Sequence, residues 1–267
     1  MGLTIAVANQ KGGVGKTATA VNLGAALALE KHRTLLIDLD SQGSATSGLG
    51  EARQSGASSY ELLTADLSVH AAAKPTAVPG LDLVCATRDL AGAEIELVAA
   101  KDRQWRLREK LDPAREAYEF VLIDCPPALG MLTLNALSCA DGVLVPLQCE
   151  FYALEGLGAL LETIERVRAA FNPQLEVLGI LLTMYDSRTS LSRQVAQEVR
   201  GHFADKVLHA MVPRNVRISE SPSHGIPVVV YDPASTGSAA YRQVAREILQ
   251  MAARRQGEAR MQGGQLG

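Results

Sequence analysis

The sequence of 267 residues has little of several features that define other classes of protein. Aromatic residues make up only 4% of it, so its core must be built from aliphatic side chains. No apolar run approaches the roughly 20 residues that a membrane-spanning helix needs, which argues against a membrane-spanning protein. The net charge of −3 gives no overall attraction to nucleic acids or acidic membranes, so any such binding must depend on local clusters of basic residues.

Cysteines are also few, and they follow no ligand pattern. The four of them, Cys85, Cys125, Cys139 and Cys149, show no C-x-x-C spacing, and three lie in or beside apolar runs. Buried free thiols in a reducing cytosol explain this pattern better than disulfides or a metal site. The apolar start of the chain is too short for a signal peptide and runs directly into a glycine-rich loop. We therefore expect a soluble, cytoplasmic protein.

What the sequence does contain is aliphatic residues in short runs. Hydrophobic residues make up 47% of the chain, enough for a sizeable core, and runs rich in Leu, Val, Ile and Ala favour a parallel sheet buried on both faces. We expect strands at 3–8, 34–40, 81–86, 120–124, 141–150, 177–184 and 207–212. Helical patterns alternate with them, chiefly at 18–30, 89–100, 153–171, 190–203 and 237–253. This alternation predicts an α/β fold with a doubly wound, mostly parallel sheet of seven or eight strands flanked by helices.

The stretch Asn9 to Thr17 reads N-Q-K-G-G-V-G-K-T and lies between the first expected strand and the first expected helix. A strand, a glycine-rich turn and a helix start are the context that a phosphate-binding loop requires. Backbone N–H groups of the loop converge on an anion, and the N-terminus of the helix adds partial positive charge. Lys16 is expected to reach the β- and γ-phosphates and Thr17 to ligate Mg²⁺. The alternative is a glycine-rich turn that binds nothing.

The loop departs from the ordinary phosphate-loop pattern. Gln10 stands where that pattern has its first glycine, and a second lysine, Lys11, follows it. Two lysines around one loop are more than a single triphosphate needs from one chain. We interpret Lys11 as a charge supplied to a second nucleotide across a dimer interface.

Three aspartates follow apolar strands. Asp38 and Asp40 end the expected strand 34–40, and Asp124 ends the expected strand 120–124. In open α/β sheets the carboxyl ends of the strands are where ligands bind. Asp124, in combination with the phosphate loop, is typical of an acidic residue that holds a metal-bound water. For Asp38 alone, capping of the strand or of the next helix is the competing interpretation.

The motif K-G-G-V-G-K-T resembles the deviant phosphate loop of the ParA/MinD superfamily of ATPases, in which the first lysine is the signature residue. Three further stretches, D-L-D-S-Q-G-S-A-T-S-G-L-G, I-D-C-P-P and Q-C-E-F-Y-A-L-E-G, resemble specifically its chromosomal ParA, or Soj-type, branch. The resemblance extends from about Leu3 to Leu249 and implies a P-loop NTPase fold. It implies ATP and Mg²⁺ as cofactors and weak ATP hydrolysis that a ParB-type centromere-binding partner stimulates.

The resemblance also implies roles for individual residues. Lys11, Lys16 and Asp40 are the expected catalytic residues, with Asp40 orienting the attacking water. Thr17, Asp38 and Asp124 are expected near Mg²⁺. Pro213 is expected to pack on the adenine and Asn215 to hydrogen-bond its edge. The remaining contacts to the nucleotide are expected from the loop and the start of its helix, at Gly12, Gly13, Val14, Gly15 and Ala18.

DNA binding is the second implied activity. Arg188 and Arg217 match arginines that contact DNA in the ParA branch, and the segment between them has six Lys or Arg residues against two Asp or Glu residues. A local positive face on an acidic protein suits binding to the phosphate backbone without reading of bases. Arginines that only keep the surface soluble are the alternative.

Two positions depart from the family. Ala18 stands where a second Thr or Ser usually follows Thr17, which removes a hydroxyl contact to the nucleotide. Ile226 stands where a lysine often follows Ser-His-Gly, which removes one basic contact.

We expect one ParA-type ATPase domain over residues 1–253 and a flexible glycine- and glutamine-rich tail over 254–267. The implied function is chromosome or plasmid partition by an ATP-dependent homodimer that binds double-stranded DNA non-specifically, so the protein would associate with the nucleoid. One alternative is a MinD-like ATPase of the division site, although the tail has too few apolar residues for a stable membrane anchor. The others are a biosynthetic amide-forming ligase and a pure DNA-binding regulator.

Overall fold

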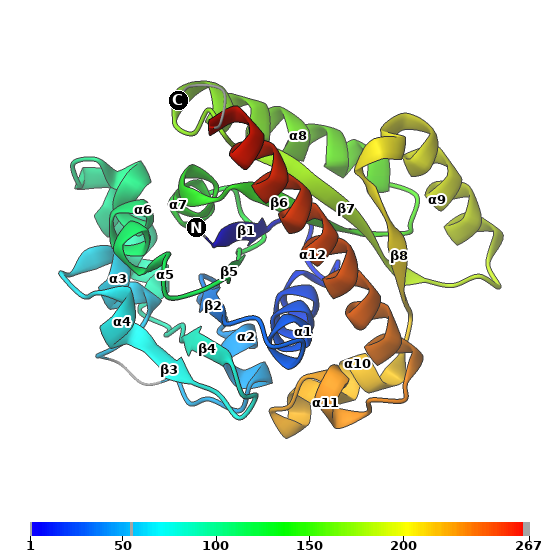
Figure 1. Ribbon diagram of the computed structural model, residues 1–267, viewed down its shortest axis with the longest axis horizontal. Helices are drawn as coiled ribbons and strands as arrows, with labels where there is room; N and C mark the ends of the chain where they lie inside the picture. The colour runs from blue at the N-terminus through cyan, green and yellow to red at the C-terminus, as the bar shows by residue number, and fades with distance from the viewer. Residues whose placement is uncertain (1, 54–55, 264–267) are drawn as a thin grey trace.

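The computed structural model describes residues 2–53 and 56–263 of the chain. In these residues the chain forms an eight-stranded sheet with helices on both faces (Figure 1). The strands are β1 (Leu3–Val7), β2 (Thr34–Asp38), β3 (Ala73–Pro75), β4 (Leu81–Val84), β5 (Phe120–Asp124), β6 (Gly142–Gln148), β7 (Glu176–Tyr185) and β8 (Val207–Pro213). Their order across the sheet is β3-β4-β2-β5-β1-β6-β7-β8. The expected α/β fold with a doubly wound, mostly parallel sheet is therefore confirmed.

Twelve α-helices connect and cover the strands within the described residues. They are α1 (Lys16–Leu29), α2 (Ser44–Gly48), α3 (Ser59–Thr64), α4 (Val69–Ala72), α5 (Leu90–Glu96), α6 (Arg106–Leu111), α7 (Met131–Cys139), α8 (Ala153–Ala170), α9 (Ser190–Phe203), α10 (Val216–Glu220), α11 (Val228–Tyr231) and α12 (Thr236–Gly263). Short 3-10 turns supplement them at η1 (Leu97–Ala99), η2 (Arg103–Trp105), η3 (Asp112–Ala114), η4 (Ala204–Lys206) and η5 (Ser221–His224).

The core has two halves because successive side chains of a strand point to opposite faces of the sheet. Ile5, Val7 and Leu36 pack with α1 and α12 on one face. Leu35 and Ile37 pack with α6, α7 and α8 on the other. Strands β2 and β5 are buried along their whole length, which agrees with their continuous aliphatic sequences.

The parallel register places the expected site residues together at the carboxyl ends of the strands. Strand β5 lies between β1 and β2, and Asp124 is opposite both Val7 of β1 and Asp38 of β2. The phosphate loop follows β1 at the same level. Three segments that are distant in the sequence therefore meet where their strands end.

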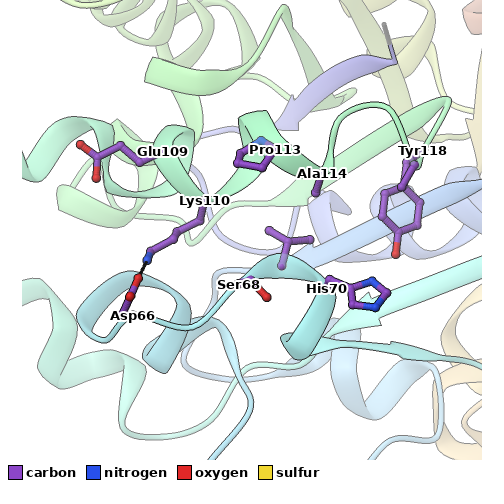
Figure 2. Close-up of a pocket in the computed structure, with 10 residues that line it drawn as sticks. Asp66, Ser68, His70, Glu109, Lys110, Pro113, Ala114 and Tyr118 are labelled. Atoms are coloured by element: carbon purple, nitrogen blue, oxygen red, sulfur yellow. Dashed lines mark hydrogen bonds and ion pairs between the residues drawn. The ribbon is translucent and has the colours of Figure 1, made fainter.

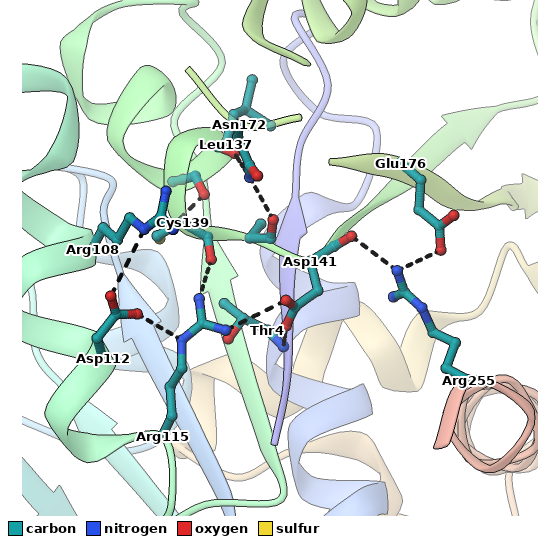
Figure 3. Close-up of polar contacts among 12 residues, drawn as sticks. Thr4, Arg108, Asp112, Arg115, Leu137, Cys139, Asp141, Asn172, Glu176 and Arg255 are labelled. Atoms are coloured by element: carbon teal, nitrogen blue, oxygen red, sulfur yellow. Dashed lines mark hydrogen bonds and ion pairs between the residues drawn. The ribbon is translucent and has the colours of Figure 1, made fainter. Parts of the chain in front are cut away.

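At the amino-terminal ends of the strands lies a polar network around Asp141 (Figure 3). Its carboxylate accepts a hydrogen bond from the backbone N–H of Thr4 at 2.7 Å and one from Arg115 at 3.4 Å. Its backbone carbonyl accepts one from Arg255 at 3.3 Å, and Arg255 also pairs with Glu176 at 2.7 Å. The network joins α12 to the starts of β1, β6 and β7, so it has a structural role.

Two details differ from expectation. Strand β3, which was not expected, pairs antiparallel with β4 at the edge of the sheet. The last helix continues to Gly263, so the first ten residues of the expected flexible tail are helical, and residues 264–267 lie outside the described residues. Among the helices of the described chain, none is both long and apolar enough to cross a membrane.

Candidate nucleotide site

The loop between β1 and α1 is held in shape by two neighbouring strands. Gly13 and Gly15 have φ angles of 74° and 88°, which are strained for any residue with a Cβ atom. The Thr183 hydroxyl of β7 donates to the carbonyl of Val14 at 2.8 Å. The Asn9 side chain donates to the carbonyl of Pro146 in β6 at 2.7 Å. These contacts from the chain itself fix the shape of the loop.

Lys16 is buried at the start of α1 and points back into the loop. Its Nζ donates to the carbonyl oxygen of Lys11 at 2.8 Å. Burial lowers the pKa of Lys16, while the nearby charge of Asp124 acts in the opposite direction. The first turn of α1 also holds the other expected contacts, Thr17 and Ala18, whose position at a helix N-terminus suits an anion.

Asp38 and Asp124 lie side by side but differ in their hydrogen bonding. The two Asp38 oxygens accept from the backbone N–H of Asp40 at 3.1 Å and from the N–H and hydroxyl of Thr46 at 2.8 and 2.7 Å. Burial raises the pKa of Asp38 to about 6. The oxygens of Asp124 are buried and accept no hydrogen bond of normal geometry among the described residues, although the side chain of Thr17 lies close to them. Burial, and then the charge of Asp38, raises the pKa of Asp124 well above its usual value, and the contact with Thr17 opposes this rise.

This difference makes Asp124 the carboxylate whose burial a cation would offset most. An unpartnered buried carboxylate is costly, and a bound cation removes the cost. Asp124 is thus suited to hold a divalent cation or its water. Asp38, whose oxygens accept three hydrogen bonds, holds the segment after β2 in place, and its position beside Mg²⁺ stays a prediction. Asp40 is half-buried beyond it and accepts a hydrogen bond from the N–H of Gln42 at 2.9 Å.

Lys11 lies on the exposed side of the loop and forms an ion pair with Glu150. Glu150 follows β6 and belongs to the same chain, so the signature lysine is engaged within its own subunit in this single chain. The next two residues, Phe151 and Tyr152, are 77% and 64% exposed although aromatic. No sequence signal indicated the Lys11–Glu150 pair, because 139 positions separate the two residues.

Pro213 is the last residue of the edge strand β8, and Asn215 lies just after that strand, which is three strands away from β1. Asn215 caps α10 by accepting from the N–H of Arg217 at 2.8 Å, and its amide donates to Thr236 at 2.8 Å. The segment that follows returns to the phosphate-loop helix, where the N–H of Val228 donates to the Asn22 side chain at 2.6 Å. Asn22 is a positioning residue that the sequence motifs did not indicate.

Arg188 lies in the loop after β7, and Arg217 lies in α10, which follows the neighbouring strand β8; both are exposed. The N–H of Arg214 donates to the carbonyl of Tyr185 at 3.1 Å and joins the two loops. Arg188 pairs with Asp186 at 2.7 Å, and Arg217 pairs with Glu220 at 2.9 Å and Asp232 at 3.3 Å. Asp186 and Glu220 lie two and three residues outside the segment 188–217, and Asp232 lies further along the chain, so the face is less positive than the charges of that segment indicate.

The chain also has a cavity of about 540 Å³ that none of these residues lines. It lies between α4 and the α6–η3 segment, with Val69, Pro113 and Tyr118 among its walls (Figure 2). Lys110 and Asp66 form an ion pair at its side. The cavity is therefore separate from the candidate nucleotide site.

The parallel sheet, the glycine loop with its buried lysine and the unpartnered aspartate define an ATPase of the P-loop class. Comparison with known proteins identifies the family. A family model described as an AAA domain matches residues 2–177. The chromosome partitioning protein ParA of Caulobacter vibrioides is 54% identical over 96% of this chain and 97% of its own. The sporulation initiation inhibitor protein Soj of Bacillus subtilis is 51% identical over 93% of this chain and 98% of its own.

A solved structure is also similar. It is described as cobyrinic acid a,c-diamide synthase from Mycobacterium smegmatis with bound ADP and magnesium. It is 41% identical, with a TM-score of 0.81, over 94% of this chain and 95% of that one. The chain belongs to the ParA/Soj family of chromosome-partitioning ATPases, as the sequence motifs indicated.

Proposed function

We propose that this chain binds ATP with Mg²⁺ in the loop after β1, hydrolyses the ATP slowly, and uses the cycle to partition DNA. The observation that carries the proposal is the buried Lys16 in the glycine loop beside the unpartnered buried carboxylate of Asp124. The relatives named ParA and Soj support it, as does the neighbour described with ADP and magnesium. One domain over residues 1–253 would perform the whole reaction.

The roles within the site follow from chemistry. Thr17 and Asp124 would hold Mg²⁺ directly or through water, and Asp38 would act from beside them by fixing Thr46. Mg²⁺ supplies the positive charge that offsets the phosphates. Lys16 and the amides of residues 12–18 would hold the phosphates, Pro213 and Asn215 the adenine. Asp40 would orient the attacking water, because phosphoryl transfer needs little beyond positioning and charge neutralisation.

Dimerisation is proposed to depend on Lys11. Its ammonium would leave Glu150 and reach the triphosphate held by a second copy of the chain. The exposed position of Lys11 and the exposed aromatic residues beside Glu150 support a dimer interface on this side of the phosphate loop. ATP binding and dimerisation would then be linked, because each nucleotide site is complete only with a positive charge from the other subunit.

The paired form is proposed to bind double-stranded DNA non-specifically through Arg188 and Arg217, on the nucleoid. Two copies bring two such faces together, which matters because each arginine is partly neutralised within its own chain. A ParB-type centromere-binding protein would stimulate hydrolysis and release the dimer from DNA. Weak intrinsic turnover would follow from the need for that partner.

The proposal is tested by gel filtration of the Asp40→Ala variant with ATP, with and without a random-sequence duplex. We expect a stable ATP-bound dimer that elutes with the duplex, while the wild-type protein returns to monomer as it hydrolyses ATP. Normal hydrolysis by the variant would refute the role of Asp40. A monomer at every protein concentration would refute the dimer.

Two rivals are distinguished by simple measurements. The 41% identical structure described as a diamide synthase makes an amide-forming ligase the second candidate, and ATP turnover that requires a small acid substrate and ignores DNA would favour it. A MinD-like role at the membrane would be favoured if liposomes recovered the protein only with ATP.

A further inference from the structure

The segment after Asp40 touches the segment that carries Arg217, backbone to backbone. Gly50 lies just beyond α2 and Gly225 just beyond η5, with φ angles of 78° and 66°. A Cβ atom on Gly225 would lie 2.6 Å from the Cα of Gly50, and one on Gly50 would lie 3.2 Å from the carbonyl oxygen of Gly225. Both the φ angles and the contact therefore require glycine.

On the nucleotide side, the position of Gly50 is set by Asp38. Asp38 holds both the N–H and the hydroxyl of Thr46 in α2. The end of α2 is closed by hydrogen bonds from the N–H of Gly50 to Ser47 at 3.0 Å and from that of Glu51 to Thr46 at 3.1 Å. Only this short, hydrogen-bonded helix separates Asp38 from the glycine contact.

On the other side, Gly225 is joined just as directly to the arginine. Helix α10 carries Arg217 and runs without interruption into η5, which ends beside Gly225. The N–H of Gly225 donates to Pro222 at 3.1 Å and that of Ile226 to Ser221 at 3.3 Å, so the turn is firmly closed. Three residues later Val228 is tied to Asn22 of α1.

We propose that the Gly50–Gly225 contact couples the state of the nucleotide to the DNA-binding face. This inference rests on the proposed function and names its internal regulation. Two backbones in contact have no flexible side chain between them, so a shift of α2 displaces η5 and α10 instead of being absorbed. Loss of the γ-phosphate would displace Asp38 and Asp40, and the displacement would reach Arg217 through this contact.

The proposal is tested by measuring the Kd for a random duplex with a non-hydrolysable ATP analogue and with ADP. In the Gly225→Ala variant we expect the ratio of the Kd with ADP to the Kd with the ATP analogue to fall by about tenfold, the scale of a typical allosteric coupling. Gly50→Ala, whose added methyl group meets a less severe contact, is expected to have a smaller effect. Gly80→Ala is the matched control, because Gly80 has a φ angle of 86° but its Cβ would meet nothing closer than 3.6 Å. An unchanged ratio in Gly225→Ala would overturn the inference.

Hydrogen exchange on the wild-type protein tests the same coupling without any variant. We expect the amides of residues 221 and 223–226 to exchange at different rates in the ATP-analogue and ADP states, and identical rates would overturn the inference. If the wild-type protein fails to bind DNA in either state, the proposed function fails, while the exchange result still decides the coupling.

Discussion

At the scale of single residues, the site is built from charged side chains that the fold buries. Lys16 is held in the loop by the backbone carbonyl of Lys11. Asp124 accepts no hydrogen bond of normal geometry among the described residues. A ligand that carries both negative phosphates and a divalent cation satisfies both residues at once. Mg²⁺ with a nucleotide is such a ligand.

The first prediction concerns Lys16. Lys16→Ala removes the buried ammonium of the loop, and we expect the affinity for ATP to fall by about 10- to 100-fold, the range for a hydrogen bond to a charged group. A fluorescent nucleotide titration measures the change. Lys101→Ala, at an exposed position outside the site, serves as the control and should bind as wild type does. Equal affinity in the two variants would refute the role of Lys16.

A second residue-scale prediction concerns the pH dependence of stability. The folded-state pKa of Asp124 is raised well above 3.8 by burial, so the folded protein binds more protons than the unfolded chain above that pH. Its contribution to the free energy of unfolding therefore falls as pH rises from about 4 towards the raised pKa.

Asp124→Asn removes this pH-dependent destabilisation. At pH 8 without nucleotide we expect the variant to be more stable than wild type by about 1–3 kcal/mol, the cost of an unsatisfied buried group, and the difference to shrink as the pH is lowered. Urea unfolding at several pH values measures it, with the exposed Asp205→Asn as control. The variant should also lose Mg²⁺-dependent hydrolysis. A difference that stays constant with pH would contradict this account.

At the scale of elements, the sequence was most informative where a signal is local. The loop 9–17 and the aspartates at the ends of β2 and β5 were predicted because strand, turn and helix follow one another within a few residues. The Lys11–Glu150 pair was not predictable, because parallel strands bring together loops that the chain separates widely.

Other misses have local causes. Strand β3 has three residues and includes Pro75, so it shows no strand pattern. The end of α12 is rich in Gln, Arg, Ala and Met, which are good helix formers, and this propensity outweighed the glycines that suggested a flexible tail. The basic count between Arg188 and Arg217 stopped two residues short of Asp186.

The ion pair between the phosphate loop and the β6–α8 loop leads to the third prediction. In Glu150→Gln, Lys11 is released from its own chain and becomes available to a partner nucleotide. We expect ATP-dependent dimers to form at a protein concentration lower by up to about fivefold, the range for an exposed ion pair. Analytical ultracentrifugation with Asp40→Ala as the background measures this. Glu162→Gln, which breaks an exposed pair with Arg166 in α8, is the matched control. Weaker dimerisation in Glu150→Gln would mean that Glu150 itself contributes to the interface.

At the scale of the whole molecule, the candidate nucleotide loop and the segments that carry Arg188 and Arg217 all follow the carboxyl ends of parallel strands. The nucleotide loop follows the central strand β1, and the arginine loops follow β7 and β8 on one side of it. The amino-terminal ends of β1, β6 and β7 are tied together by the Asp141 network, so the proposed contacts to nucleotide and to DNA would all come from loops at the other end of the strands.

The last prediction concerns how the whole molecule holds DNA. Arg188→Ala and Arg217→Ala should weaken binding of the ATP-loaded protein equally on duplexes of different sequence, because phosphate contacts carry no base information. The slope of log K against log salt should fall in magnitude by about one for each phosphate that the variant no longer neutralises. Arg166→Ala, at an exposed arginine with an acidic partner on α8, should leave the slope unchanged. The ion pairs of Arg188 and Arg217 sharpen the test, because Asp186→Asn frees Arg188 and should strengthen binding. A base-specific footprint, or weaker binding in Asp186→Asn, would show that these arginines hold the loops in shape instead of contacting DNA.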